Sequence, residues 1–138
     1  MGLRVANYGS TASEIAICVK RAGLVERSGL EVLELRGAAP WLEHLLSRAV
    51  GDGVPAVGRA VAAASSWCCR VQDDLALVVG PTTSVAAWRR LARGSLIGGS
   101  AIHRHDLGAT TALSLVGPRA QQVLTAAALA DVPAVGGV

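Results

Sequence analysis

A strand-like segment that ends in glycine and leads into a helix-like segment occurs twice in this chain. The first copy is the apolar run 32–37 followed by helical spacing in 38–46, and the second is 112–117 followed by 118–124. Glycine permits the sharp turn that each copy needs after its strand. One structural unit therefore begins twice. Because the chain ends at Val138, we expect the second unit to hold only its first helix and to need a partner that covers it.

The composition indicates a globular domain with an aliphatic core. A length of 138 residues is enough for one domain that buries a core without a metal or a disulfide. Hydrophobic residues make up 51% and charged residues 17%, which excludes a disordered tail. Phenylalanine is absent, so we expect the three tryptophans to be the bulky core residues. The net charge of +3 is spread along the chain without a basic stripe, which argues against a nucleic-acid partner.

The apolar segments and the cysteines indicate the compartment. No apolar run is long enough to span a bilayer, and the N-terminus lacks the apolar region of a signal peptide. The cysteines, Cys18 and the adjacent Cys68 and Cys69, have no metal-ligand spacing and form no even disulfide framework. We therefore expect a cytoplasmic protein with reduced thiols and no membrane partner.

The order of the expected elements predicts the fold class. The patterns predict, in order, a helix at 12–22, a strand at 30–36, a helix at 41–49, a hairpin with a long irregular first arm at 58–71 and a second arm at 75–79, a helix at 84–92, a short exposed strand at 101–106, a buried strand at 110–116 and a helix from 118 to about 130. Residues 30–116 thus have the order strand, helix, strand, strand, helix, strand. This order is the ferredoxin-like split βαβ motif, an antiparallel sheet with helices on one face.

We therefore predict an α+β fold in a single truncated domain. Residues 1–29 form an N-terminal helix segment, 30–116 the ferredoxin-like unit, and 117–138 the start of a second repeat. A sheet of aliphatic strands with helices on one face leaves an apolar face well beyond the few hundred Å² that monomers usually expose. Since closed two-fold dimers are the commonest assembly, we expect a homodimer or a heteromer with a related chain.

Two ordered motifs resemble the opening of the glycine cleavage system T protein, an aminomethyltransferase. The first comprises Tyr8-Gly9, Glu14 and the segments 22–28 and 33–37, and the second is LVGPRAQQVL at 115–124. The sequence is equally similar to the gamma subunit of heterotetrameric sarcosine oxidase and to related folate-binding proteins. The resemblance covers most of this chain but only the first third or so of a full T protein.

The resemblance implies tetrahydrofolate as a cofactor and a role in one-carbon metabolism. It also implies an aspartate near residues 64–65 that acts on the folate nitrogen. This chain has no carboxylate between Asp52 and Asp73. Without a group that accepts or positions a proton, the acid–base step has no obvious agent, so we assign no catalytic residue.

Two pairs of residues are candidates for ligand binding. Gly117 and Arg119 open a helix after a strand, where free N–H groups could hold an anion such as a folate glutamate or a phosphate. His103 and His105 would share one face of a strand and could bind a metal with a third ligand, or they belong to an exposed polar edge. We assign no metal to the chain and keep the two histidines as weak candidates.

Three further groups have a structural interpretation beside a chemical one. Asp73 and Asp74 could be an acid–base pair, or they stabilise a hairpin turn. Cys68 and Cys69 could supply a nucleophile, but without a nearby base we expect them to pack in the sheet. His44 lies beside Glu43 on a helix and is expected at its surface.

These observations lead to a main hypothesis and to alternatives. The main hypothesis is a non-catalytic T-protein-like subunit or binding module that associates with itself or with a T-protein-like or oxidase subunit, with folate as its candidate ligand. The alternative is a tetrahydrofolate-dependent aminomethyl or methyl transferase whose site is completed across a dimer interface. A basic nucleic-acid-binding ferredoxin-like domain is a third, less favoured, interpretation.

Overall fold

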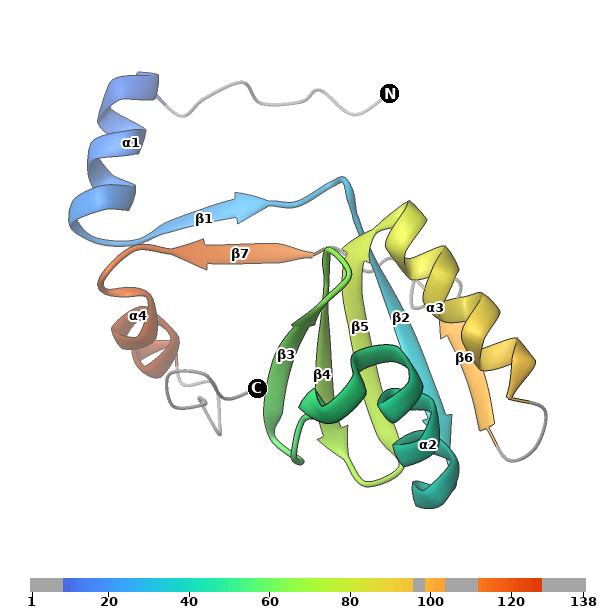
Figure 1. Cartoon of the computed structure of the whole chain (residues 1–138). Helices are drawn as coiled ribbons and strands as arrows, with labels where there is room; N and C mark the ends of the chain where they lie inside the picture. The colour runs from blue at the N-terminus through green and yellow to red at the C-terminus, as the bar shows by residue number, and fades with distance from the viewer. Residues whose placement is uncertain (1–8, 96–98, 104–111, 128–138) are drawn as a thin grey trace. The chain divides into compact units, whose positions relative to one another are not determined.

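The computed structural model describes residues 9–95, 99–103 and 112–127, which form two compact units (Figure 1). Unit 1 contains the helices α1 (Thr11–Lys20) and α4 (Ala120–Ala126) and the strands β1 (Gly23–Glu26) and β7 (Leu113–Val116). Unit 2 contains β2 (Leu30–Gly37), α2 (Ala39–Val50), the short 3-10 helix η1 (Gly51–Gly53), β3 (Arg59–Ala63), β4 (Ser66–Gln72), β5 (Leu75–Pro81), α3 (Thr82–Gly94) and β6 (Gly99–His103).

Unit 2 is a five-stranded antiparallel sheet in the order β3-β4-β5-β2-β6. The crossover from β2 through α2 leads to the β3–β4 hairpin, and β5 lies between β2 and β4. The crossover from β5 through α3 leads to β6, and β2 lies between them. This interleaving is the ferredoxin-like arrangement, with β3 as an additional edge strand. The predicted α+β fold class is confirmed.

The core of unit 2 lies between the sheet and its two helices. Alternation along β2 directs Leu33 and Leu35 toward the helices, and both are fully buried. Helices α2 and α3 contribute residues at helical spacing. The buried cluster comprises Leu33, Leu35, Trp41, Leu42, Leu45, Leu46, Cys68, Ala76, Val78, Val85, Trp88 and Ala92. The core is aliphatic with two tryptophans. The expectation that Trp67 is also a core residue is wrong, because its neighbour Cys68 takes the buried side of β4 and Trp67 is 56% exposed.

The segment expected as one long irregular hairpin arm is two strands. Strands β3 and β4 are joined by a two-residue turn at Ala64 and Ser65, whose φ angles are 45° and 63°. Positive φ at both turn positions matches the twist of a hairpin and is usually supplied by Asn-Gly or Asp-Gly. Because neither position carries such a residue, the sequence contains no turn signal there.

The expected last strand of the ferredoxin-like sheet is a strand, but it belongs to unit 1. Leu113–Val116 pairs with Gly23–Glu26 in a separate two-stranded antiparallel sheet. Its expected burial is also wrong, since Leu113 is 57% exposed. Gly99–His103 pairs with β2 instead and completes the five-stranded sheet. Among the helices of the described ranges, none has the length and hydropathy needed to cross a bilayer.

Candidate functional site

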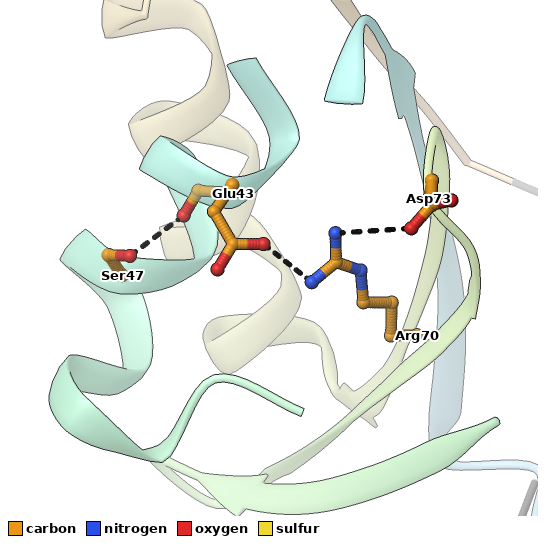
Figure 2. Close-up of polar contacts among 4 residues, drawn as sticks. All are labelled: Glu43, Ser47, Arg70 and Asp73. Atoms are coloured by element: carbon orange, nitrogen blue, oxygen red, sulfur yellow. Dashed lines mark hydrogen bonds and ion pairs between the residues drawn. The ribbon is translucent and has the colours of Figure 1, made fainter. Parts of the chain in front are cut away.

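A charged cluster joins α2 to the tip of the β4–β5 hairpin (Figure 2). Arg70 Nη1 donates to Glu43 Oε2 at 2.5 Å, and Arg70 Nη2 lies 3.8 Å from Asp73 Oδ1. The Arg70 side chain is only 11% exposed, whereas that of Glu43 is 51% exposed. Ser47 Oγ donates to the backbone oxygen of Glu43 on the same helix at 2.9 Å. The guanidinium group therefore holds the helix against the hairpin, and the cluster acts as a structural clamp.

Asp73 and Asp74 form the two-residue turn between β4 and β5. Both side chains are exposed, and the backbone oxygen of Asp74 accepts a hydrogen bond from the N–H of Gly37 at 3.0 Å. Asp73 is engaged with Arg70. This geometry supports the turn interpretation of the aspartate pair. His44 lies exposed on α2.

The position at which the resemblance implies a catalytic aspartate is the tight turn at Ala64 and Ser65. Both residues are exposed, and neither carries a carboxylate. The next residue, Ser66, is buried, and its hydroxyl accepts from Trp88 Nε1 at 3.0 Å and donates to the backbone oxygen of Ala63 at 2.5 Å. The hydroxyl is therefore engaged in packing the hairpin against α3.

Gly117 and Arg119 lie at the corner between β7 and α4 in unit 1. Gly117 has a φ of 115°, and a Cβ at this position would lie 2.5 Å from the backbone oxygen of Cys18 and 2.6 Å from that of Arg21. The N–H of Arg119 donates to the Arg21 oxygen at 2.9 Å. The glycine is thus required by close packing against the end of α1, and anion binding at this corner stays a prediction.

A shallow groove of about 410 Å³ lies between α1 and α4. Its lining includes the apolar side chains of Ile17 and Val123 and the two cationic residues Arg21 and Arg119. An apolar wall beside guanidinium groups suits a ligand that has a flat apolar part and a carboxylate or phosphate. The sequence motifs pointed to Arg119 but gave no sign of Arg21, because Arg21 reaches the groove only through the packing of α1 beside α4.

His103 is the last residue of β6, at the register position of Leu33, and His105 lies outside the described residues. Within the described ranges, no group of three or more His, Cys, Asp or Glu side chains is placed to hold a metal ion. Metal binding by the two histidines stays a prediction.

The adjacent cysteines of β4 lie on opposite faces of the sheet. Cys68 is fully buried in the core, and this burial, with the neighbouring Cys69 thiol, raises the pKa of Cys68 to about 12. Burial also raises the pKa of Cys69. A thiol with a raised pKa is a poor nucleophile near neutral pH, which supports the packing interpretation.

Unit 1 has no buried residue among those described. Leu24 and Leu113 lie on one face of the two-stranded sheet, together with Leu115, because Leu24 is opposite Leu115 in the ladder. Leu24 is 66% exposed, and Val19 of α1 is 68% exposed. The exposed large apolar side chains of unit 1 are Ile15, Ile17, Val19, Leu24, Val25, Leu113, Val116 and Val123. Val25 and Val116 lie on the face of the two-stranded sheet opposite Leu24 and Leu113. We call the whole set the unit 1 apolar surface.

The face of the five-stranded sheet opposite the helices is also apolar. The register places Ala62, Trp67 and Val79 in one cross-strand row and Ala60, Cys69 and Leu77 in the next. These six residues, which are exposed or half-buried, are called the apolar sheet face. Glu34 continues the second row and is 5% exposed, and its Oε1 accepts from Arg36 Nε at 3.0 Å. The ion pair with Arg36 accompanies the burial of this carboxylate.

Comparisons with known proteins identify this architecture at the level of fold. No protein-family model matches the sequence, and no curated protein matches it. Among solved structures, the glycine cleavage system aminomethyltransferase T from Bartonella henselae superimposes with a TM-score of 0.65 at 19% identity. The match covers 85% of this chain and 35% of that chain.

A second solved structure supports the same assignment. The heterotetrameric sarcosine oxidase from Corynebacterium sp. U-96 superimposes with a TM-score of 0.58 at 24% identity, over 82% of this chain and 60% of that chain. The protein is therefore an α+β protein built on a ferredoxin-like sheet. More particularly, it has a T-protein-like fold, and it spans about a third and three-fifths of the two matched chains.

Proposed function

We propose that this protein is a non-catalytic T-protein-like module that works by association with another polypeptide, either a second copy or a T-protein-like or oxidase subunit. The observation that carries the proposal is the unit 1 apolar surface. A two-stranded sheet is marginally stable in water unless further strands or a packed helix bury one of its faces. In unit 1 the described helices bury no residue. A partner that covers Leu24 and Leu113 would supply the missing burial.

The character of this surface fits a protein partner. Exposed apolar patches mark interaction sites in soluble proteins when their side chains share one face. The face that carries Leu24, Leu113 and Leu115 has one charged residue on its two strands, Glu26, at the end of β1. One of the structural neighbours is a chain of a heterotetrameric enzyme, which supports a role within an assembly. The proposal places the module in the cytoplasm, where the free thiols of the chain remain reduced.

The absence of a carboxylate at residues 64–65 supports the non-catalytic part of the proposal. The turn there is closed by backbone pairing of Ala63 with Ser66, and the neighbouring hydroxyl is bound to Trp88. A general acid or base must lie within hydrogen-bond reach of the proton it moves.

The groove that contains Arg21 and Arg119 supports a folate as the ligand, because a guanidinium fork pairs with glutamate carboxylates. Because this groove would also hold the folate of a transferase, the tetrahydrofolate-dependent transferase is the second candidate function. In that case the partner would supply the acid–base group.

Site-specific photocrosslinking in the cells of origin tests the association. A photoreactive amino acid replaces Leu24 on the unit 1 apolar surface, and in a matched variant it replaces the exposed Thr83 at the start of α3. We expect the Leu24 variant to give one adduct of defined mass, with a second copy or with a distinct subunit, and the Thr83 variant to give none. Equal labelling by both variants, or no adduct from Leu24, would contradict the proposal.

A further inference from the structure

Strand β3 is one edge of the five-stranded sheet, and no strand among the described residues pairs with its outer side. The two-residue turn makes Ala63 and Ser66 the first hydrogen-bonded pair of the hairpin. Since bonded and non-bonded pairs alternate along an antiparallel ladder, Ala60 and Ala62 direct their N–H and C=O groups away from β4. The outer edge of β3 thus offers two donors and two acceptors at regular spacing.

This edge lacks the features that usually prevent pairing. Edge strands are commonly protected by lysine, by proline, by a bulge or by an inward-pointing charge. The sequence of β3 is Arg-Ala-Val-Ala-Ala, and its register with β4 is continuous from Arg59 to Ala63. The irregular pairing, in which the N–H of Gly58 donates to the oxygen of Arg70 at 2.8 Å, lies before Ala60. Its one charged residue, Arg59, is at the first position. Ala62 is exposed, and its small side chain leaves room for an approaching strand.

The edge is complementary to itself in the antiparallel direction. A two-fold axis at Val61 places Ala60 of one copy opposite Ala62 of the other, so both copies exchange the outward N–H and C=O groups of these residues. The same register places Arg59 opposite Ala63, which keeps the two guanidinium groups at opposite ends of the interface. Like charges therefore do not meet, and only small side chains flank the axis.

The apolar sheet face is continuous across such an interface. Trp67 is opposite Ala62 in the β3–β4 ladder, and Cys69 is opposite Ala60. Pairing of Ala62 with Ala60 of the second copy joins the Trp67 row of one molecule to the Cys69 row of the other. Trp67, which is 56% exposed, would then stand on each side of the axis as a large apolar anchor.

We propose that β3 is the self-association edge of this protein, and that two copies form one continuous sheet about a two-fold axis through Val61. This inference rests on the proposed role in association and assigns it a second surface, separate from the unit 1 apolar surface. The partner at this edge is a second copy of the chain.

Sedimentation of the full chain tests the edge. We expect the wild-type protein to sediment at micromolar concentration as a dimer of the 14.0 kDa chain. Ala62→Lys should raise the dimer dissociation constant at least about tenfold, because lysine on an edge strand opposes pairing. Ala87→Lys adds the same charge to an exposed alanine of α3 and should leave the constant unchanged. The double variant Ala60→Lys/Ala62→Glu should restore dimerisation, since the two new charges would face each other across the axis.

Hydrogen exchange of the wild-type protein gives a reading that does not depend on a variant. The amides of Ala60 and Ala62 should exchange at least about tenfold more slowly at high than at low protein concentration, while that of Val61 should not change. A monomeric wild-type protein, or a dimer that Ala62→Lys leaves intact, would overturn the inference. Either result would leave the Leu24 photocrosslink as a separate test of the association role.

Discussion

The indole Nε1 of Trp88 donates a hydrogen bond to the hydroxyl of Ser66, 3.0 Å away, and thereby ties helix α3 to the β3–β4 hairpin. Both residues are buried, at 4% and 3% exposure. The approach is close on the strand side as well, because a Cβ at Gly80 would lie 2.7 Å from Ser66 Cβ. The hairpin that carries the proposed edge strand is therefore positioned by one serine.

Ser66→Ala should lower the free energy of unfolding by about 1 to 3 kcal/mol, because it leaves the buried indole N–H of Trp88 without its acceptor. Urea denaturation measures the change. Ser47→Ala removes an exposed hydroxyl that bonds within α2, and it should cost less than about 0.5 kcal/mol. Equal losses in the two variants would show that the Trp88 contact contributes no specific stability.

Ser65→Gly should stabilise the protein by about 0.5 to 1 kcal/mol. Ser65 has a φ of 63°, a conformation that costs a residue with a Cβ about 1 to 2 kcal/mol, and relief of this cost exceeds the entropy that glycine adds to the unfolded chain. Ala62→Gly, in the adjacent extended strand, should be destabilising by about 0.5 to 1 kcal/mol. The urea midpoints of the two variants should move in opposite directions, and a common direction would contradict the turn geometry.

The Arg70–Glu43 contact should show a coupling energy of about 0.5 to 1.5 kcal/mol in a double-mutant cycle. The value exceeds that of most surface pairs because the Arg70 side chain is only 11% exposed, and it stays modest because Glu43 is half exposed. The cycle uses Arg70→Met, Glu43→Gln and the double variant, each measured by urea denaturation. A coupling near zero would mean that the clamp seen in Figure 2 does not stabilise the helix against the hairpin.

Cys68 should make the protein less stable in alkali. Burial raises the pKa of its thiol from 9.0 to about 12, so the folded state retains a proton that the unfolded state loses. The stability that the retained Cys68 proton contributes to the folded state is fully present below pH 9, falls as the pH rises, and is lost by about pH 12. Between pH 8 and pH 10.5 the free energy of unfolding of the wild-type protein should fall by about 2 kcal/mol more than that of Cys68→Val. Parallel pH profiles of the two proteins in urea denaturation would contradict this origin.

The groove between α1 and α4 should bind tetrahydrofolate without turnover. In isothermal titration, Arg119→Ala should weaken binding at least about tenfold, because one of the two guanidinium groups of the groove is lost. Arg93→Ala, at an exposed position near the end of α3, should have no effect. Absence of heat with both tetrahydrofolate and its 5-formyl derivative would remove folate from the proposal, and aminomethyl transfer by the isolated chain would favour the enzyme.

Local patterns predicted the parts of the fold that depend on neighbouring residues. Helical spacing predicted α2 and α3, and apolar runs predicted β2 and β5. The pairing of β1 with β7 was missed because Gly23–Glu26 is too short to show a period and its partner is distant in the sequence. The Ala64–Ser65 turn was missed because its residues are atypical for positive φ.

The candidate site was less predictable than the fold, because its contacts join residues that are distant in the sequence. The motif around Gly117 was visible, but its close contact with Cys18 and Arg21 depends on tertiary packing. Arg70 and Glu43 are separated by 27 positions, and no local pattern links them. Strand alternation alone could not show that Glu34 is buried, since alternation assigns a residue to a sheet face but does not give its exposure.

A region in which every described side chain reaches water has a low free energy of local unfolding, because it has little buried surface to lose. Unit 1 should therefore be the part of the molecule that proteases cut first when the chain is alone, since cleavage follows the population of open states. Occupied by its counterpart, the same region would be shielded. The cellular amount of this protein would then follow the supply of whatever it binds, and surplus copies would be removed by degradation.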